Sequence, residues 1–220
     1  MVEKPANEKE RLALLRQYEI LDSVEEVMFD ELARLAAHVC DAKSAYVSFV
    51  DENRQWLKAS YCFDIKQTSR DTAFCAHAIL EPEIHIIPDT TADKRLSDNP
   101  LVVEEPHIRF YAGVPLHLDN DKAIGTLCVV DYESKSLTEQ QIESLKIIAS
   151  QVVARIELQH VQRTLDEQVA TQRKKLLDEI QGRSQTENLL QTVLDAIPHA
   201  VFWKDRNSAY LGVNQAFADD

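Results

Sequence analysis

The sequence predicts an α+β domain with a central antiparallel sheet and helices packed on one face, followed by a long C-terminal helix of coiled-coil type. Strand-like segments follow one another in hairpin order, with helical periodicity before and after them. Between Thr138 and Ile197 the chain contains no proline and only one glycine, Gly182. This stretch is rich in good helix formers, and at 1.5 Å per residue it would extend roughly 90 Å, more than one domain can bury.

Two helices are predicted at the N-terminal end of the domain. Residues 7–21 carry helical periodicity through Leu12, Leu15 and Leu21. Ser23, with Glu26 three residues later, forms a capping box that would open a second helix. The apolar positions of that helix are Phe29, Leu32, Leu35, Ala36 and Val39.

Five strands and a short helix are predicted next. The strands are residues 45–50, 55–61, 84–87, 110–118 and 123–131. Polar turns at 51–54 and 119–122 would close two hairpins, and residues 74–80 have the pattern of a short helix. Gly113 and Gly125 fall inside strands, which indicates a bulge or a close backbone approach, and Pro115 indicates an edge or a bulge.

The long helix has a defined start and a coiled-coil pattern. Thr138 and Gln141 form a capping box. Apolar residues then follow the 3-4-3-4 spacing of a dimer seam. They are Leu145, Ile148, Val152, Val169, Leu176, Ile180, Leu190, Leu194 and Ile197.

Between Arg155 and Asp166 this seam fails, because the apolar residues Leu158, Val161 and Leu165 each come one position early. Such an offset turns the apolar stripe by about 100° on a helix. The recovery of the register favours a parallel homodimeric coiled coil. The alternative is a helix packed on its own domain near Val152 and solvated beyond it.

Composition excludes several classes of function. The net charge is −13, whereas proteins that bind nucleic acid or anionic membranes need a basic surface. No segment has the pattern of a secretory signal or a membrane span. The four cysteines contain no C-x-x-C pair, which indicates reduced thiols in a cytoplasmic protein. They are Cys40, Cys62, Cys75 and Cys128.

Several separated motifs follow one another along the predicted domain. The pair 109–116 (RFYAGVPL) and 124–131 (IGTLCVVD) resembles the final strands of bacterial GAF domains. The motifs at 71–79 (DTAFCAHAI), 88–90 (PDT) and 93–100 (DKRLSDNP) match the same subgroup. The resemblance covers about residues 8–158 and is specific because the motifs are several and ordered.

The end of the chain resembles the start of a PAS domain. Residues 189–217, including 203–206 (WKDR) and 210–217 (YLGVNQAF), match its first helix and strands. We therefore expect a fragment of a longer protein. Its parts would be a GAF-like sensory domain at 1–137, with a C-terminal helix continuing to about 158, a signalling helix at 138–196 and a truncated PAS-like start at 197–220.

The resemblance implies a ligand pocket on one face of the sheet. Its candidate residues are Phe74, Cys75, His77, Asp89, Thr90, Arg95, Arg109 and Tyr111. No covalently attached tetrapyrrole is expected, because Ala76 separates Cys75 from His77 and the phytochrome pattern places the two side by side. A small buried thiol beside a cap or pocket histidine is the favoured interpretation of that pair. For Asp89, a turn or helix cap is favoured over a pocket rim.

Cyclic-nucleotide binding is a second option within the family, and it needs donors for a phosphate. Arg70, Arg95 and Arg109 are the candidates, but pairing with nearby carboxylates such as Asp71, Asp98 or Glu105 is favoured. The remaining histidines lack the spacing of a metal site. These are His38, His85, His107 and His117.

The sequence thus predicts the sensory part of a cytoplasmic signalling protein that binds an unidentified small ligand or partner. A dimeric helix would relay the signal to an output domain, implied to be a histidine kinase of a two-component system or a diguanylate cyclase/phosphodiesterase. No nucleic-acid or membrane partner is expected. One alternative is a reductase of free methionine sulfoxide, which would need a cysteine within 108–111, where none occurs, or a disfavoured Cys62–Cys75 pair. The other is a purely structural dimerisation module.

Overall fold

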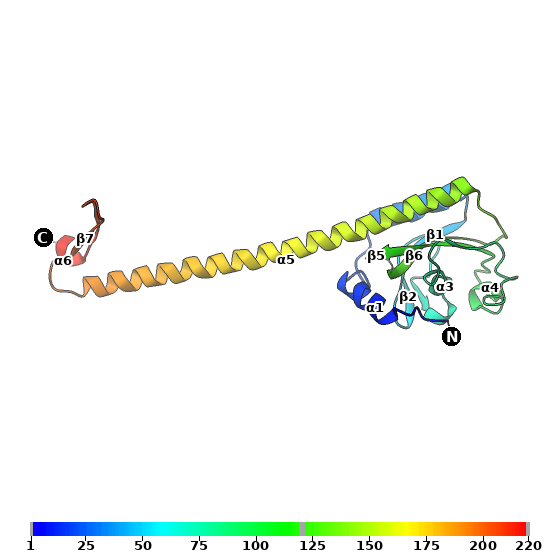
Figure 1. Cartoon of the computed structure of the whole chain (residues 1–220), viewed down its shortest axis with the longest axis horizontal. Coiled ribbons are helices and arrows are strands. Elements are labelled where there is room, and N and C mark those ends of the chain that lie inside the picture. Colours follow the sequence, from blue (N-terminus) through cyan, green and yellow to red (C-terminus); the bar gives the residue numbers. More distant parts are fainter. Residues whose placement is uncertain (1, 119–121, 219–220) are drawn as a thin grey trace. The chain divides into compact units, whose positions relative to one another are not determined.

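The computed structural model describes residues 2–118 and 122–218, and it divides into two compact units, Met1–His160 and Val161–Asp220. The first unit is the sheet-containing part of Figure 1, labelled with β1, β2, β5 and β6. Its six-stranded antiparallel sheet has the order β3-β2-β1-β6-β5-β4. The strands are β1 (Ser44–Val50), β2 (Arg54–Tyr61), β3 (Gln67–Ser69), β4 (His85–Ile87), β5 (Phe110–Leu118) and β6 (Lys122–Asp131). The predicted α+β class and the central antiparallel sheet are confirmed.

Helices cover one face of this sheet. They are α1 (Glu8–Gln17), α2 (Val27–Val39) and the first turns of α5 (Glu139–Asp195). Ala33, Ala36 and Ala37 of α2 are fully buried, and their small side chains let the helix lie close to the strands. Leu15 of α1 and Phe29 of α2 complete this core with inward-facing strand residues.

The second face of the sheet is covered as well. Its cover consists of the 3₁₀ turn η1 (Arg70–Thr72), α3 (Phe74–Ala78), α4 (Pro100–Val103) and the loops between them. A second apolar core fills the space beneath these elements. Short helices and loops thus cover the face of the sheet on which the sequence predicts a ligand pocket.

The predicted end of the first helix and the predicted start of the second both differ from the structure. The first helix ends at Gln17, earlier than predicted, and Glu19 and Asp22 in the following turn have positive φ angles. The capping box predicted from Ser23 and Glu26 is wrong. Ser23 Oγ donates to the carbonyl of Ile20 at 2.6 Å, and Glu26 lies at the helix start without a side-chain cap bond.

The capping box at the start of the long helix is confirmed. The backbone N–H of Gln141 donates to Thr138 Oγ1 at 3.3 Å, and the N–H of Thr138 donates to Gln141 Oε1 at 2.9 Å. Gly125 is also explained, since a Cβ there would lie 2.0 Å from the carbonyl oxygen of Ser48. Pro115 lies on β5 beyond the last residue that pairs with β4. Its missing N–H therefore removes no hydrogen bond to β4. The predicted turn at 119–122 lies mostly outside the described residues.

Part of the predicted dimer seam lies inside the first unit. Leu145, Ile148 and Val152 are at most 5% exposed and pack into the core formed by α1, α2 and the sheet. These three residues are therefore unavailable to a second chain, and their assignment to a dimer interface is wrong. The later seam residues are different: Val169, Leu176, Ile180 and Leu190 are more than half exposed.

The second unit contains the rest of α5, the hairpin β7 (Phe202–Lys204) and β8 (Tyr210–Val213), and α6 (Gln215–Ala218). Asn214 is buried, and its side chain donates to the carbonyls of Leu194 and His199 while accepting from the N–H of Val201. Asn214 thus ties the hairpin to the end of the helix. The PAS-like assignment of this unit stays a prediction.

Candidate functional site

Three of the predicted pocket residues meet on the second face of the sheet. Phe74 and Cys75 lie on α3 and Tyr111 lies on β5, and none of them has exposed surface. The rings of Phe74 and Tyr111 stack with their centroids 5.4 Å apart. These side chains pack against one another on this face, and the ligand pocket expected around them stays a prediction.

A cluster of polar atoms surrounds the sulfur of Cys75. Gln55 Nε2 donates to Cys75 Sγ at 3.2 Å, and the Tyr111 hydroxyl donates at 3.4 Å. Cys128 Sγ of β6 lies 3.8 Å away and also contacts the carbonyl oxygen of Tyr46 at 3.5 Å. Sequence reasoning missed Cys128 as a partner, since only the folded sheet brings β6 under α3.

The two thiols of this cluster have different acidities. Burial raises the pKa of Cys75, but hydrogen bonds from Cys128, Ser48, Thr126 and Tyr111 outweigh it and lower this pKa to about 6. Burial, together with the hydrogen bond and charge of Cys75, holds the pKa of Cys128 well above its ordinary value. Cys75 is thus the more acidic thiol of the pair.

Asp89, Thr90 and Arg109 stabilise the loops at one end of β5. Asp89 Oδ1 accepts from the backbone N–H of Thr91 at 2.9 Å, which confirms its favoured turn role. The buried Thr90 hydroxyl donates to the carbonyl of Ile108 at 2.6 Å. Arg109 Nη1 donates to the carbonyl of Val102 at 2.8 Å, which is a backbone contact in place of the predicted carboxylate pair.

Arg95 and His77 lie at the edge of the domain. Arg95 pairs with Asp93 at 2.6 Å and lies 3.5 Å from His85 Nε2. Burial lowers the pKa of His77, and the positive charge of Arg95 adds to that effect. Arg70 bonds to Glu8 rather than to the predicted Asp71. The favoured pairing of arginines with carboxylates thus holds for Arg70 and Arg95, with partners that the sequence did not reveal.

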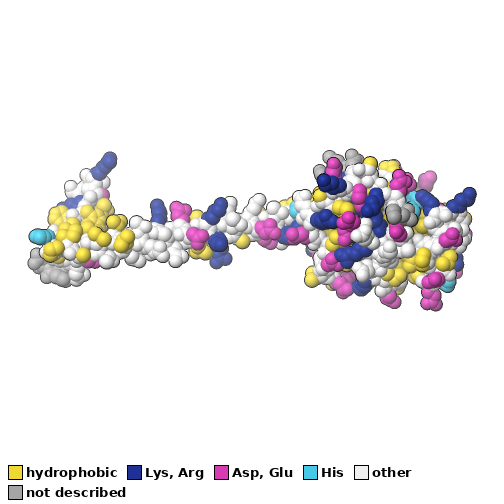
Figure 2. Space-filling model, turned by 90° about the horizontal axis from the view of Figure 1, so that it is seen from below, with side chains coloured by type: hydrophobic (Ala, Val, Ile, Leu, Met, Phe, Trp, Pro, Cys, Tyr) yellow, Lys and Arg dark blue, Asp and Glu magenta, His cyan; other side chains and the backbone are white. Residues whose placement is uncertain are grey.

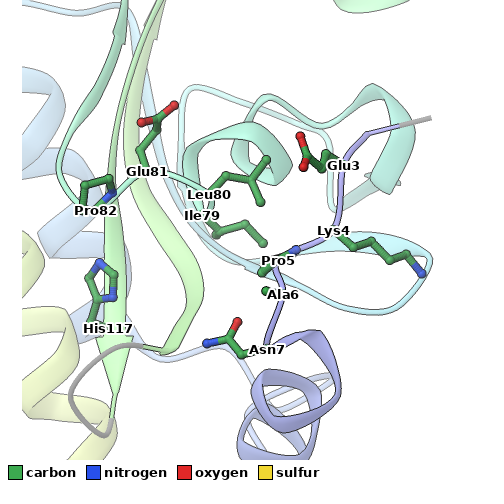
Figure 3. A pocket seen from close by; sticks show the side chains of 10 residues that line it. All are labelled: Glu3, Lys4, Pro5, Ala6, Asn7, Ile79, Leu80, Glu81, Pro82 and His117. Atoms are coloured by element: carbon green, nitrogen blue, oxygen red, sulfur yellow. The ribbon is translucent and has the colours of Figure 1, made fainter.

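A cavity that sequence reasoning missed lies beside the N-terminal arm, residues 3–7. It has a volume of about 750 Å³. Figure 3 shows the arm passing Ile79 and Leu80, with His117 of β5 and Pro82 on another side. The arm is held at its start, where the N–H of the buried Val2 donates to Asp71 Oδ1 at 3.1 Å. No pattern in residues 3–7 marks them as part of a site.

The chemistry of this arm cavity is mixed. Its lining combines apolar surface with the polar side chains of Glu3, Asn7, Glu81 and His117, while Lys4 turns away from the other lining residues (Figure 3). His117 Nε2 is buried and has no hydrogen-bond partner among the described residues. Its volume is in the range of small-ligand sites, about 300–1,000 Å³, although the lining of such sites is usually more apolar.

Comparison with protein families decides the identity of the domain. The model of the GAF domain matches residues 25–156, which is more than half of the chain. The chain belongs to the GAF domain family. It is 35% identical over 200 residues to "Cyclic di-GMP phosphodiesterase PA2567" of Pseudomonas aeruginosa, a match that covers 90% of this chain. The chain spans about a third of the length of that curated relative, 34%.

Solved structures agree on the fold of the GAF domain. The GAF domain of an Acinetobacter phosphoenolpyruvate-protein phosphotransferase is similar, with a TM-score of 0.53 and 19% identity over 71% of this chain and 96% of that one. A type II free methionine-R-sulfoxide reductase from Thermoplasma acidophilum is also similar, with a TM-score of 0.50 and 12% identity. That match covers 59% of this chain and 90% of the reductase chain. At such low identities the likeness shows the fold alone.

The GAF domain holds the start of α5 through a charged contact as well as through its apolar core. Glu26, at the start of α2, pairs with the buried Lys58 of β2 at 2.8 Å. Its second carboxylate oxygen meets Arg155 at 3.5 Å and accepts from Gln159. We call these four residues the Glu26 contact. It explains the polar residues in the seam: Arg155 and Gln159 occupy seam positions but face their own GAF domain.

Other kinds of site find no support in the part of the chain that the structure covers. Within residues 2–118 and 122–218, no three side chains of His, Cys, Asp or Glu come together in a way that would hold a metal ion. No helix in those ranges is both long and apolar enough to cross a bilayer. On the visible face of the GAF domain, basic and acidic side chains are intermixed (Figure 2).

Proposed function

We propose that this chain is the sensory part of a cyclic-di-GMP signalling protein. In this proposal the GAF domain detects a small polar ligand and α5 relays its state, in a parallel homodimer, to an output domain that degrades cyclic di-GMP. The chain itself would have no catalytic role. The named activity of the relative from Pseudomonas aeruginosa supports this choice of output over a histidine kinase.

One observation carries the proposal. The first turns of α5 form part of the GAF core through Leu145, Ile148 and Val152, and the same helix continues to Asp195. In this proposal a change in the sheet shifts the first turns of α5, because both belong to the same packed core. The Glu26 contact lies where α5 leaves this core. In this proposal it determines how a shift of the core moves the rest of α5.

The arm cavity is the proposed ligand site. The cavity lies against β5, because His117 of that strand lines it. Glu81 and Pro82 also line the cavity, and Glu83 in the same turn pairs with Lys146 of α5. A ligand that moved this turn would act on the first part of α5. The exposed apolar residues of α5 beyond His160 are the proposed dimer surface, because a homodimer in register would cover them symmetrically.

A pair of matched substitutions tests the ligand site. Ala6→Trp fills the arm cavity, whereas Lys9→Trp adds the same bulk on the exposed face of α1. The probes are cyclic mononucleotides and free amino acids, each scored by native mass spectrometry. We expect at least one probe to bind the parent chain and Lys9→Trp but to bind Ala6→Trp at least tenfold more weakly. Equal binding to both variants, or binding of no probe, would contradict a ligand site in this cavity.

A further inference from the structure

The buried thiols on the second face of the sheet do not take part in the proposed ligand site. Cys75 and Cys128 have no exposed surface, and their sulfurs lie 3.8 Å apart. They come from different elements, α3 and β6, and are 53 residues apart in the chain. All four cysteines are free. Two free thiols in van der Waals contact need only a short approach to reach the bond length of a disulfide, about 2.05 Å.

The surroundings of this pair are unusual for buried cysteines, which are typically packed in apolar surroundings. Gln55 is buried and turned toward Cys75, and its Oε1 accepts from Thr68 Oγ1 at 3.3 Å, so that its NH₂ group faces the sulfur. The Tyr111 hydroxyl reaches the same sulfur because the position below it is Gly113. Two donors thus converge on Cys75, as they would on a thiolate.

We propose that Cys75 and Cys128 form an oxidisable dithiol, in which a hydroperoxide reacts at Cys75 and Cys128 then closes an intramolecular disulfide. The proposal goes beyond ligand sensing and does not depend on the arm cavity. Cys75 is the attacking sulfur because the donors around it stabilise its thiolate. Cys128 is the resolving thiol because it is the sulfur in contact with Cys75.

The chemistry balances with a hydroperoxide as oxidant. The Cys75 thiolate attacks the terminal peroxide oxygen, so that an S–O bond forms, the O–O bond breaks and hydroxide or alkoxide leaves and is protonated. The Cys128 sulfur then attacks the sulfenic sulfur of Cys75. The S–S bond forms, the S–O bond breaks, and the proton of Cys128 leaves with the hydroxide as water. Two thiols thus lose two electrons and two protons, and the peroxide is reduced to water and, if alkylated, an alcohol.

Oxidant access requires a local opening, because neither sulfur reaches the surface. Cys75 lies on the short helix α3, which has five residues and packs over β5 and β6. Short, locally held elements open at lower cost than whole domains. The disulfide would then draw α3 toward β6, and β6 pairs with both β1 and β5 at the centre of the sheet.

The test uses the 220-residue chain with Cys62→Ser, which removes the exposed thiol and leaves Cys40 as a buried control. After treatment with hydrogen peroxide, the protein is denatured, its free thiols are alkylated, and the intact mass and peptides are measured. We expect one alkylated thiol, at Cys40, the loss of two hydrogens, and a cross-linked pair of peptides containing Cys75 and Cys128. Dithiothreitol should reverse the change.

Further samples make the result decisive. With Cys128→Ser, or Cys128→Ala should the serine variant fold poorly, oxidised Cys75 should carry oxygen instead of forming a disulfide. In urea, the preference for the Cys75–Cys128 pair should disappear, because the fold no longer brings the two sulfurs together. The proposal is wrong if the folded protein keeps three alkylatable thiols while a small-molecule thiol in the same solution is oxidised. It is also wrong if Cys40 is modified as readily as Cys75.

Discussion

Tyr111 and Gly113 show how one missing side chain shapes the interior of the GAF domain. A Cβ on residue 113 would lie 2.1 Å from the hydroxyl oxygen of Tyr111 and 2.7 Å from its ring carbon Cζ. Tyr111 cannot move aside freely, because it is fully buried and stacked on Phe74. Gly113 therefore provides the space that lets the Tyr111 hydroxyl reach Cys75.

Gly113→Ala should lower the free energy of unfolding of the GAF domain by about 1–3 kcal/mol, the usual cost of overpacking a core. Gly182→Ala is the control, because nothing lies within 4 Å of its added methyl group. That variant should leave the GAF domain unchanged and favour the helix. Both free energies are measured by urea unfolding followed by tryptophan fluorescence, in a Trp203→Phe background so that only Trp56 of the GAF domain reports. Equal stability of the two variants would contradict the close contact between Tyr111 and Gly113.

Individual residues could be predicted from the sequence only where local chemistry fixes their role. The Thr138–Gln141 cap and the Asp89 turn are of this kind, because their partners are two or three residues away. The contact of Cys75 with Cys128 was not predictable, since it depends on which strand passes beneath α3. The Ser23–Glu26 box failed for the same reason: the tertiary partner Lys58 outweighed the local cap.

At the level of elements, the Glu26 contact fixes where α5 separates from the GAF domain. Lys58 is 4% exposed and also donates to Ser23 Oγ at 2.8 Å and to the carbonyl of Val24 at 2.5 Å. The carboxylate of Glu26 supplies the negative charge nearest to this buried ammonium group. Removal of Glu26 would leave Lys58 buried without that charge, and it would free Arg155 and Gln159 on α5.

Glu26→Ala should reduce the free energy of unfolding by about 3 kcal/mol, because breaking one side of a buried ion pair leaves an uncompensated charge. Glu25→Ala is a matched control one residue away. Glu25 pairs with Lys66 at 2.8 Å, but both side chains are more than two-thirds exposed, so little change is expected. Chemical denaturation compares the two variants. If they were equally stable, the Glu26 contact would not hold the helix as described.

The order of the elements could largely be predicted, whereas the role of the long helix could not. Alternating strands, turn residues and helical periodicity predicted the sheet with its hairpins. The 3-4-3-4 spacing of α5 is ambiguous, since a helix that packs on its own domain and a helix in a coiled coil need the same apolar stripe. Leu145, Ile148 and Val152 pack on their own domain, whereas Leu176 is exposed. The sequence pattern is the same for all four residues and does not distinguish the two roles.

At the scale of the whole molecule, the sheet of the GAF domain and the first turns of α5 belong to one packed core. The arm cavity and the buried dithiol are two separate proposed inputs, one on the surface and one in the core. Both would act on α5 through the strands β5 and β6. The proposed relay includes a second copy of the chain, which would cover the exposed apolar residues of α5 beyond His160.

The most direct test of this relay is disulfide cross-linking between two copies at a seam position. Leu176→Cys is placed in a Cys62→Ser background, with Asp178→Cys as the control on the opposite side of the helix. In a parallel, in-register dimer the two residues at position 176 come within the Cα separation that a disulfide allows, about 4.4–6.8 Å. We predict that mild oxidation converts most of the Leu176→Cys chain to a covalent dimer on a non-reducing gel and leaves Asp178→Cys monomeric. No cross-link at position 176, or equal cross-linking at both positions, would contradict the parallel helical relay.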